Sequence, residues 1–269
     1  MTFRGASAEA FEATRRELET VVSGTADAAK VGGDLFSVVA ILRSEPGLRR
    51  VVTDMSLPAQ AKSGLVREIL GGKVDDGALF VVVTAVERRW AAGRDLADAL
   101  EQLGVEAVVR SALSESERLA DELFAVGQLV KEQPELRDAL SDPARSIEDK
   151  RGLVRSLLDG KALPATIRLV EQAVTGTHRT VGIALKEYQR VAAEVHGEGV
   201  ATVRVAHPLS DVELRRLADS LARQYGRPVH LNVVVSPEVI GGVRVEIGDD
   251  VIDGTVSSRL DEARRKLVG

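Results

Sequence analysis

The feature that most constrains the fold is an internal repeat. Shifting the chain by 88 positions aligns residues 35–86 with residues 123–174 without a gap, and about a third of the aligned positions are identical. The motif Lys-x-Gly-Leu-Val-Arg occurs at residues 62–67 and again at 150–155. Identity over such a length is far from chance, so the sequence predicts two tandem copies of one structural unit.

Each copy has the hydrophobic spacing of short amphipathic helices. Leu35, Val38, Val39 and Leu42 follow the i, i+3, i+4, i+7 pattern, and Leu123, Val126 and Val130 repeat three of these positions 88 residues later. We expect one helical bundle in residues 1–110 and a second in residues 111–197. Because 88 residues is short for a full bundle, we also expect the helix at residues 95–109 to close the first bundle and open the second.

The remaining residues, 198–269, have a different pattern. Val203 and Val205 alternate with polar residues, as do the apolar residues of 229–235 and 243–247, which predicts strands with one buried face. Ser210 followed by Glu213 predicts a capping box at the start of a helix. We therefore predict a mostly α protein with a C-terminal α+β domain, built from a strand, a helix, a strand, a hairpin and a last helix.

Composition and charge narrow the function. The net charge of −5 argues against a general nucleic-acid binder, because phosphate binding depends on a positive surface. With no cysteine, disulfides and thiol nucleophiles are excluded. The sequence also lacks both a signal-peptide pattern and the run of about 18 apolar residues that a membrane span needs. We expect any membrane association to come through a partner.

The motifs that could carry chemistry have simpler explanations. The pair Gly241-Gly242 lacks the lysine of a phosphate-binding loop, so we expect a bulge or a close backbone contact there. The acids at 249, 250 and 253 lack the spacing of a calcium loop, which favours turns. The four histidines are scattered. We therefore predict no catalytic residue, no cofactor and no metal site.

The C-terminal segment resembles a known family. An apolar strand precedes Ile240-Gly241-Gly242, an alternating strand follows, and then come Asp249-Asp250-Val251-Ile252-Asp253-Gly254 and Arg259-Leu260. This ordered series resembles the signature of the delta subunit of F-type ATP synthase, which is related to the mitochondrial oligomycin-sensitivity-conferring protein. The long form with a doubled helical domain is similar to delta subunits of actinobacteria. The residues that carry the resemblance are Gly241, Gly242, Asp250, Asp253, Gly254 and Arg259.

The resemblance implies a non-catalytic stator subunit of the peripheral stalk. In such a subunit the helical domain binds the N-terminal helix of an alpha subunit, and the C-terminal domain binds the stalk formed by the b subunit. It also implies one copy in a hetero-oligomeric complex at the cytoplasmic face of the cell membrane, so that proton-driven rotation is coupled to ATP synthesis. No nucleic acid and no direct insertion into the membrane are expected.

Both contacts would place an apolar helix face in a groove, with anchors three or four residues apart. We assign Ile167 and Val170 of the second copy to the alpha contact, and Val256, Leu260 and Leu267 of the tail to the stalk contact. The sequence leaves open which copy binds the alpha subunit. Two other functions stay open as alternatives: a nucleic-acid-binding helical-repeat adaptor, and a small-molecule enzyme, for which no convergent polar groups are visible.

Overall fold

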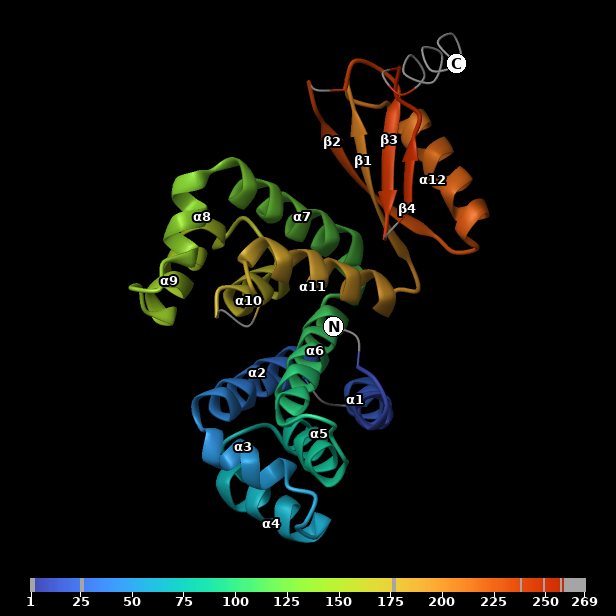
Figure 1. Ribbon diagram of the computed structural model, residues 1–269. Coiled ribbons are helices and arrows are strands. Elements are labelled where there is room, and N and C mark those ends of the chain that lie inside the picture. Colours follow the sequence, from blue (N-terminus) through green and yellow to red (C-terminus); the bar gives the residue numbers. More distant parts are fainter. Residues whose placement is uncertain are drawn as a thin grey trace, which may run out of the picture. The chain divides into compact units, whose positions relative to one another are not determined.

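The computed structural model describes residues 3–24, 27–175, 178–237, 239–248, 250–256 and 258. The chain divides into two compact units, and each is described by itself. The helical unit spans Met1–Val191 and the C-terminal unit spans Ala192–Gly269. In the described residues the helical unit has no strand, and the C-terminal unit contains all four (Figure 1).

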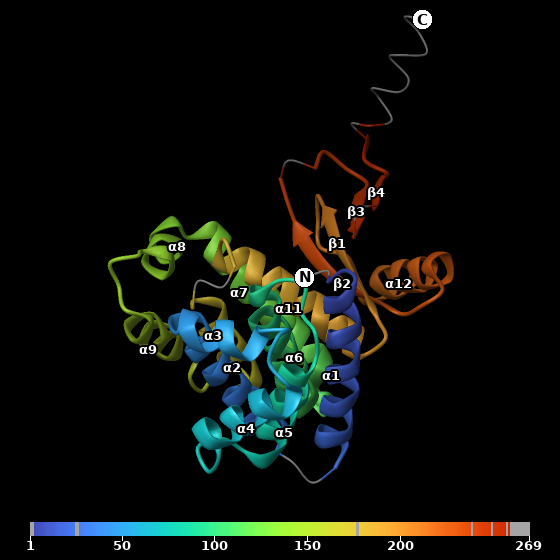
Figure 2. The ribbon, with the colours of Figure 1, turned by 60° about the horizontal axis from the view of Figure 1, so that its bottom comes forward.

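The helical unit is a series of helices joined by short connections (Figures 1 and 2). Its elements are α1 (Ala6–Ser23), α2 (Ala28–Ser44), α3 (Pro46–Thr53), α4 (Ala59–Leu70), α5 (Asp76–Glu87), α6 (Gly93–Ser111), a 3₁₀ turn (Leu113–Glu115), α7 (Ser116–Glu132), α8 (Pro134–Ser141), α9 (Ile147–Leu158), α10 (Pro164–Ala173) and α11 (Val181–Val195), whose last residues belong to the C-terminal unit.

The long helix α6 is the centre of this unit. It packs along α2 and also contacts α1, α3, α5 and α10. Leu96, Leu100 and Leu103 are fully buried. The α2 and α6 backbones approach closely, because a Cβ at Gly104 would lie 2.7 Å from the Phe36 ring. Neighbours on several sides bury most of α6, including Glu101 and Glu106, whose carboxylates are paired with Arg43 and Arg15.

The C-terminal unit holds one mixed sheet with the strand order β2-β1-β3-β4. The strands are β1 (Gly199–Val205), β2 (Val229–Val235), β3 (Val243–Ile247) and β4 (Asp250–Asp253). β1 pairs parallel with β2 and antiparallel with β3. Helix α12 (Asp211–Tyr225) makes the crossover between β1 and β2 and covers one face of the sheet (Figure 1). The predicted mostly helical chain with an α+β C-terminal unit is confirmed.

Alternation in β1 places its apolar side chains on the α12 face. Ala201, Val203 and Val205 are buried there and pack with Leu221 of α12. The predicted capping box is present, with the Ser210 side chain accepting from the Glu213 backbone N–H and Glu213 accepting from the Ser210 backbone. Local sequence chemistry therefore sets where α12 begins.

Two local features of the helical unit go beyond the sequence prediction. Pro46 and Pro134 follow the ends of α2 and α7, where a residue without an N–H is predicted to stop a helix, but each also stands at the first turn of a further helix, α3 or α8. This position tolerates proline because its N–H has no intrahelical partner. Residues 113–115 form a 3₁₀ turn, and α7 begins at Ser116. The cap residue Glu115 makes no side-chain hydrogen bond to a backbone N–H at the start of α7, although it accepts one from the Arg118 side chain at 3.1 Å.

Candidate partner-binding surfaces

The predicted alpha-contact residues lie on α10, with unequal exposure. Ile167 is half-buried, whereas Val170 is 1% exposed and packs into the helical unit. Only Ile167 therefore offers surface to a partner, and Val170 supports the helix from inside. The neighbouring Arg168 is exposed. Sequence spacing placed both residues on one face of the helix. That face is wide, so Val170 lies in the core while Ile167 lies at its edge near the surface.

The beginning of α10 is held by a carboxylate of α7. Glu122 accepts a hydrogen bond from the backbone N–H of Leu163 at 2.8 Å and another from the Thr166 hydroxyl. Arg118 also donates to Glu122 at 2.8 Å. Because Glu122 satisfies a backbone N–H at the helix start, it fixes where α10 begins and hence the position of Ile167.

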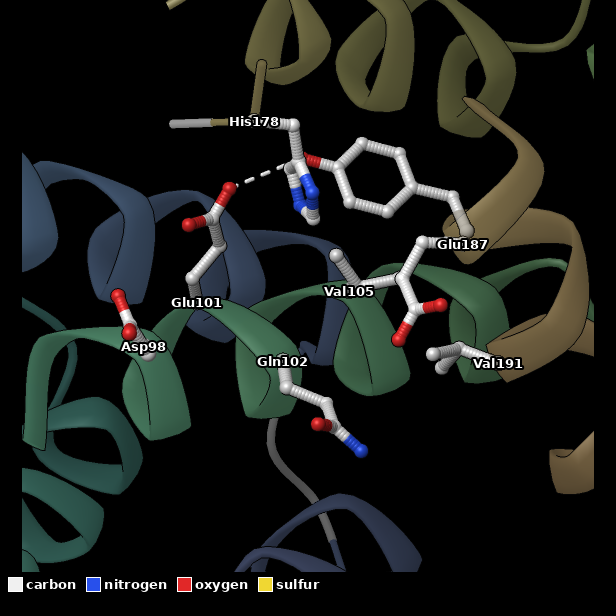
Figure 3. A pocket seen from close by; sticks show the side chains of 8 residues that line it. Asp98, Glu101, Gln102, Val105, His178, Glu187 and Val191 are labelled. Atoms are coloured by element: carbon white, nitrogen blue, oxygen red, sulfur yellow. Dashed lines mark hydrogen bonds between the residues drawn. The ribbon is translucent and has the colours of Figure 1, made fainter. Parts of the chain in front are cut away.

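A buried polar cluster that sequence analysis missed surrounds Glu101 of α6, and Figure 3 shows Glu101 with the side chains that line the adjacent small cavity. Glu101 of α6 is 2% exposed and accepts hydrogen bonds from Arg43 at 2.7 Å, Gln172 at 3.1 Å and the Tyr188 hydroxyl at 3.0 Å. The donors come from α2, α10 and α11, so one carboxylate joins helices from both halves of the unit. Burial raises the pKa of the neighbouring Asp98, and Arg43 opposes that rise.

The role of this cluster is to hold the helices together. Both oxygens of Glu101 are already occupied by donors, which leaves it poorly suited to act as a general base. The cavity lined by Asp98, Glu101, His178 and Tyr188 is only about 10 Å³. The sequence pattern could not predict this cluster, because each residue that donates a hydrogen bond to Glu101 lies at least 58 positions from it in the chain.

The glycine pair of the C-terminal signature makes a close backbone crossing. Gly242 has a φ of 83°, and a Cβ there would overlap the carbonyl oxygen of Gly254. The Val256 N–H donates to the Gly241 carbonyl, and the Gly254 N–H donates to the Val243 carbonyl. The expected close backbone contact is confirmed: these glycines tie the segment after β4 to the turn before β3.

The aspartates of the signature are engaged in local hydrogen bonds. Asp253 accepts from the backbone N–H of Thr255 at 3.0 Å and from its hydroxyl at 2.7 Å, and these bonds lower the pKa of Asp253. Asp250 accepts from the Tyr225 hydroxyl at 3.2 Å. Within the described residues no group of three or more His, Cys, Asp or Glu side chains could hold a metal ion.

Apolar side chains are exposed in this part of the C-terminal unit. Ile240 is 76% exposed, Val251 is 54% exposed and Val256 is 42% exposed. Val256 begins the predicted tail, whereas Leu260, Leu267 and the signature residue Arg259 lie outside the described residues. Exposed apolar side chains such as these are candidates for contact with a partner. No helix among the described residues is long and apolar enough to cross a membrane.

Comparison with known proteins identifies the family. The sequence model described as ATP synthase delta (OSCP) subunit matches residues 97–267. The ATP synthase subunit delta of a Nocardioides species is 56% identical, over 100% of this chain and 98% of that protein. The subunits delta of Kineococcus radiotolerans and Thermobifida fusca are 43% and 42% identical, over 98% and 99% of this chain and 98% and 100% of those proteins.

A chain in a solved structure of the Toxoplasma gondii mitochondrial ATP synthase hexamer is 19% identical, with a TM-score of 0.36, over 61% of this chain and 95% of that chain. Membership of the family depends on the sequence matches, which extend over nearly the whole chain. This chain belongs to the ATP synthase delta (OSCP) subunit family, a non-catalytic stator component of the enzyme.

Proposed function

We propose that this protein links the catalytic head of F1Fo ATP synthase to the peripheral stalk, so that the head is held still while proton flow drives rotation. The observation that carries the proposal is the 56% identity, over the full length, to an ATP synthase subunit delta. Two compact units in one chain suit a linker, because two joined contacts raise the effective concentration of each.

The partner of the helical unit is the N-terminal helix of an alpha subunit. Ile167 supports this assignment, since it is the half-buried apolar residue of α10, and Glu122 fixes the start of that helix. An amphipathic helix would place an apolar anchor against Ile167. Val170 acts indirectly, by filling the core beneath this surface.

The partner of the C-terminal unit is the b subunit of the stalk. The exposed apolar residues Ile240, Val251 and Val256 support this, and the proposed contact continues into the tail through Leu260 and Leu267. The Gly242 crossing holds the segment after β4 in place, so that Val256 is presented from a fixed position. Through these two contacts the subunit would be peripheral, at the cytoplasmic face of the membrane.

We also propose that the helical unit consists of two copies. The helices support this, since α7 and α8 have the bounds of α2 and α3 plus 88 residues. Hydrogen bonds at equivalent positions of the two copies also support the proposal. Asp34 accepts from the N–H of Asp75, as Glu122 accepts from that of Leu163. Asp54 and Asp142 each accept from the backbone N–H two residues later. Both pairs are related by the offset of 88.

Helix α6 would belong to both copies. Adding 88 to the bounds of α1 gives residues 94–111, which is α6 without its first residue. Thus α6 stands last in the first copy and first in the second. The family match supports this, because it begins at residue 97, inside α6, and not after it. The predicted boundary between residues 110 and 111 would then fall one helix too late for the second copy.

The test of the two partner contacts uses the full-length chain with a peptide of the alpha N-terminus and, separately, a soluble C-terminal fragment of b. We expect Ile167→Asp to weaken binding of the alpha peptide about tenfold and to leave binding of the b fragment unchanged. Val256→Asp should weaken binding of the b fragment and leave binding of the alpha peptide unchanged. Phe80→Asp on α5, which is 46% exposed, is the matched control. Unchanged binding in both site variants would refute these assignments.

The nucleic-acid adaptor is not supported. The matching proteins are ATP synthase subunits, and the net charge of −5 works against phosphate binding. The small-molecule enzyme gains no support from the polar cluster at Glu101 either, because its carboxylate oxygens are occupied.

A further inference from the structure

A groove of about 490 Å³ separates α2 from α9 and α10 on the helical unit. Its α2 wall is formed by small and apolar side chains, and its other wall by arginines. The lining residues are Gly33, Phe36, Ser37, Ala40 and Ile41 on α2, and Arg151, Arg155, Arg168, Glu171 and Gln172 on α9 and α10. Because the walls come from both repeat halves, neither half forms this groove alone.

The arginine wall carries excess positive charge on a chain that is acidic as a whole. Arg155 is neutralised by Glu171 and Glu148. Among the residues that the structure describes, Arg151 pairs only with Glu148, at 3.9 Å. The guanidinium of Arg168 lies against Gly33 of α2 and has no hydrogen bond or ion pair with any residue that the structure describes.

The opposite wall, on α2, is a surface of small and apolar side chains. Ser37 and Ala40 are exposed, and Ile41 is 36% exposed. Their spacing along α2 places them on one stripe, one helical turn apart. A second helix could lie along this stripe, because small side chains allow close approach.

We propose that this groove binds an amphipathic helix of a partner protein, with its apolar face on α2 and its acidic side chains toward Arg168 and Arg151. Arginine is suited to this because its planar fork donates two parallel hydrogen bonds to a carboxylate. The contact is separate from the alpha and b contacts proposed above and does not depend on them. It gives the two-copy form of the helical unit a third docking surface.

The experiment measures fluorescence anisotropy of synthetic helices of about 18 residues with the full-length chain. The probe has leucines on one face and glutamates on its flanks; one comparison peptide has lysines instead, and another has the same composition in scrambled order. We expect only the patterned acidic helix to bind, and binding to weaken with salt as the screening length falls from about 10 Å at 0.1 M to about 3 Å at 1 M.

Two variants act on opposite walls of the groove. Arg168→Glu reverses the unpaired charge, and Ala40→Trp fills the space without changing charge; each should weaken binding about tenfold. The control is Arg67→Glu on α4, an exposed arginine 88 residues before Arg155, which should bind as the unaltered chain does. Circular dichroism of each variant verifies the fold, and the uncharged Trp variant keeps the test valid if Arg168→Glu unfolds.

Three results would overturn the proposal. The first is absence of binding by the acidic helix, and the second is equal binding by the lysine helix. The third is binding that persists unchanged in both Arg168→Glu and Ala40→Trp. Displacement of the helix by inorganic phosphate as readily as by unlabelled helix would also count against it, since that would indicate a simple anion site.

Discussion

At the scale of single residues, Gly242 is the most constrained position of the C-terminal signature. Its φ of 83° is unfavourable for residues with a Cβ, and a Cβ would overlap the Gly254 carbonyl oxygen. We expect Gly242→Ala to destabilise the C-terminal unit by about 2 kcal/mol or more, from strain and overlap together. Urea unfolding of the full-length chain measures this.

Gly248 is the matched control. It has a φ of 58°, but a Cβ added there would meet no atom within 4 Å, so Gly248→Ala isolates the backbone cost, about 1 kcal/mol. Equal losses in the two alanine variants would contradict the close crossing at Gly242.

Asp253 predicts a pH dependence. Its hydrogen bonds from Thr255 hold its pKa below the ordinary 3.8, so the folded state favours the ionised form. The resulting stabilisation is present above about pH 4 and is lost as the pH falls through the folded pKa. Asp253→Ala should therefore be less stable than the unaltered chain at pH 7, and the difference should shrink below pH 4.

Thermal unfolding between about pH 7 and about pH 2.5, in steps of about half a pH unit around the ordinary pKa, gives this difference directly. Asp219→Ala, at an exposed position on α12, is the control and should change stability little at any pH. A difference for Asp253→Ala that stays constant down to the acid end would show that Thr255 does not favour the ionised form.

At the scale of elements, Glu122 and Asp34 provide a matched comparison between the two halves of the helical unit. Glu122 accepts from the Leu163 N–H, the Thr166 hydroxyl and Arg118, whereas Asp34 accepts from the Asp75 N–H. We expect Glu122→Ala to cost about 2 kcal/mol and Asp34→Ala about 1 kcal/mol.

Hydrogen exchange checks which helix is affected. The first turn of α10 should lose protection in Glu122→Ala, and the first turn of α5 should lose it in Asp34→Ala. If either substitution left its own helix protected, the carboxylate would not be what fixes the helix start.

Periodicity predicted several elements well. The apolar spacing around Leu35 and Leu123 reflects local burial, and the capping residues of α12 lie within one turn of each other. The helix α1 and the short helices α3 and α8 were not predicted. At α3 and α8 the proline indicated the end of the preceding helix, but a proline is also tolerated in the first turn of the next helix.

The candidate surfaces were only partly accessible to sequence reasoning. Spacing grouped Ile167 with Val170, but burial separates them, because contact with other helices decides which side of α10 is core. The Glu101 cluster and the arginine-lined groove depend on residues far apart in the chain. A single sequence carries no signal for such pairs except the repeat, which relates equivalent positions without showing what lies between the copies.

At the scale of the whole molecule, the proposed sharing of α6 between the two copies leads to a prediction about truncation. A chain beginning at Gly93 retains α6, whereas one beginning at Ala112 lacks it. We expect the longer fragment to unfold cooperatively and the shorter one to lose cooperative unfolding of α7–α10, because α6 contributes core contacts to α10. Circular dichroism melting compares them, and equal cooperativity in both would contradict the shared role of α6.

The central claim is that the chain couples the head to the stalk through two separate units. The most direct measurement is ATP-driven proton pumping by membranes stripped of this subunit and of the catalytic head, then resupplied with head and protein. We expect the full chain to restore pumping, whereas a chain ending at residue 197 should bind the head and leave ATP hydrolysis intact without restoring pumping. Full pumping with that shortened chain, or without any added subunit, would contradict the central claim.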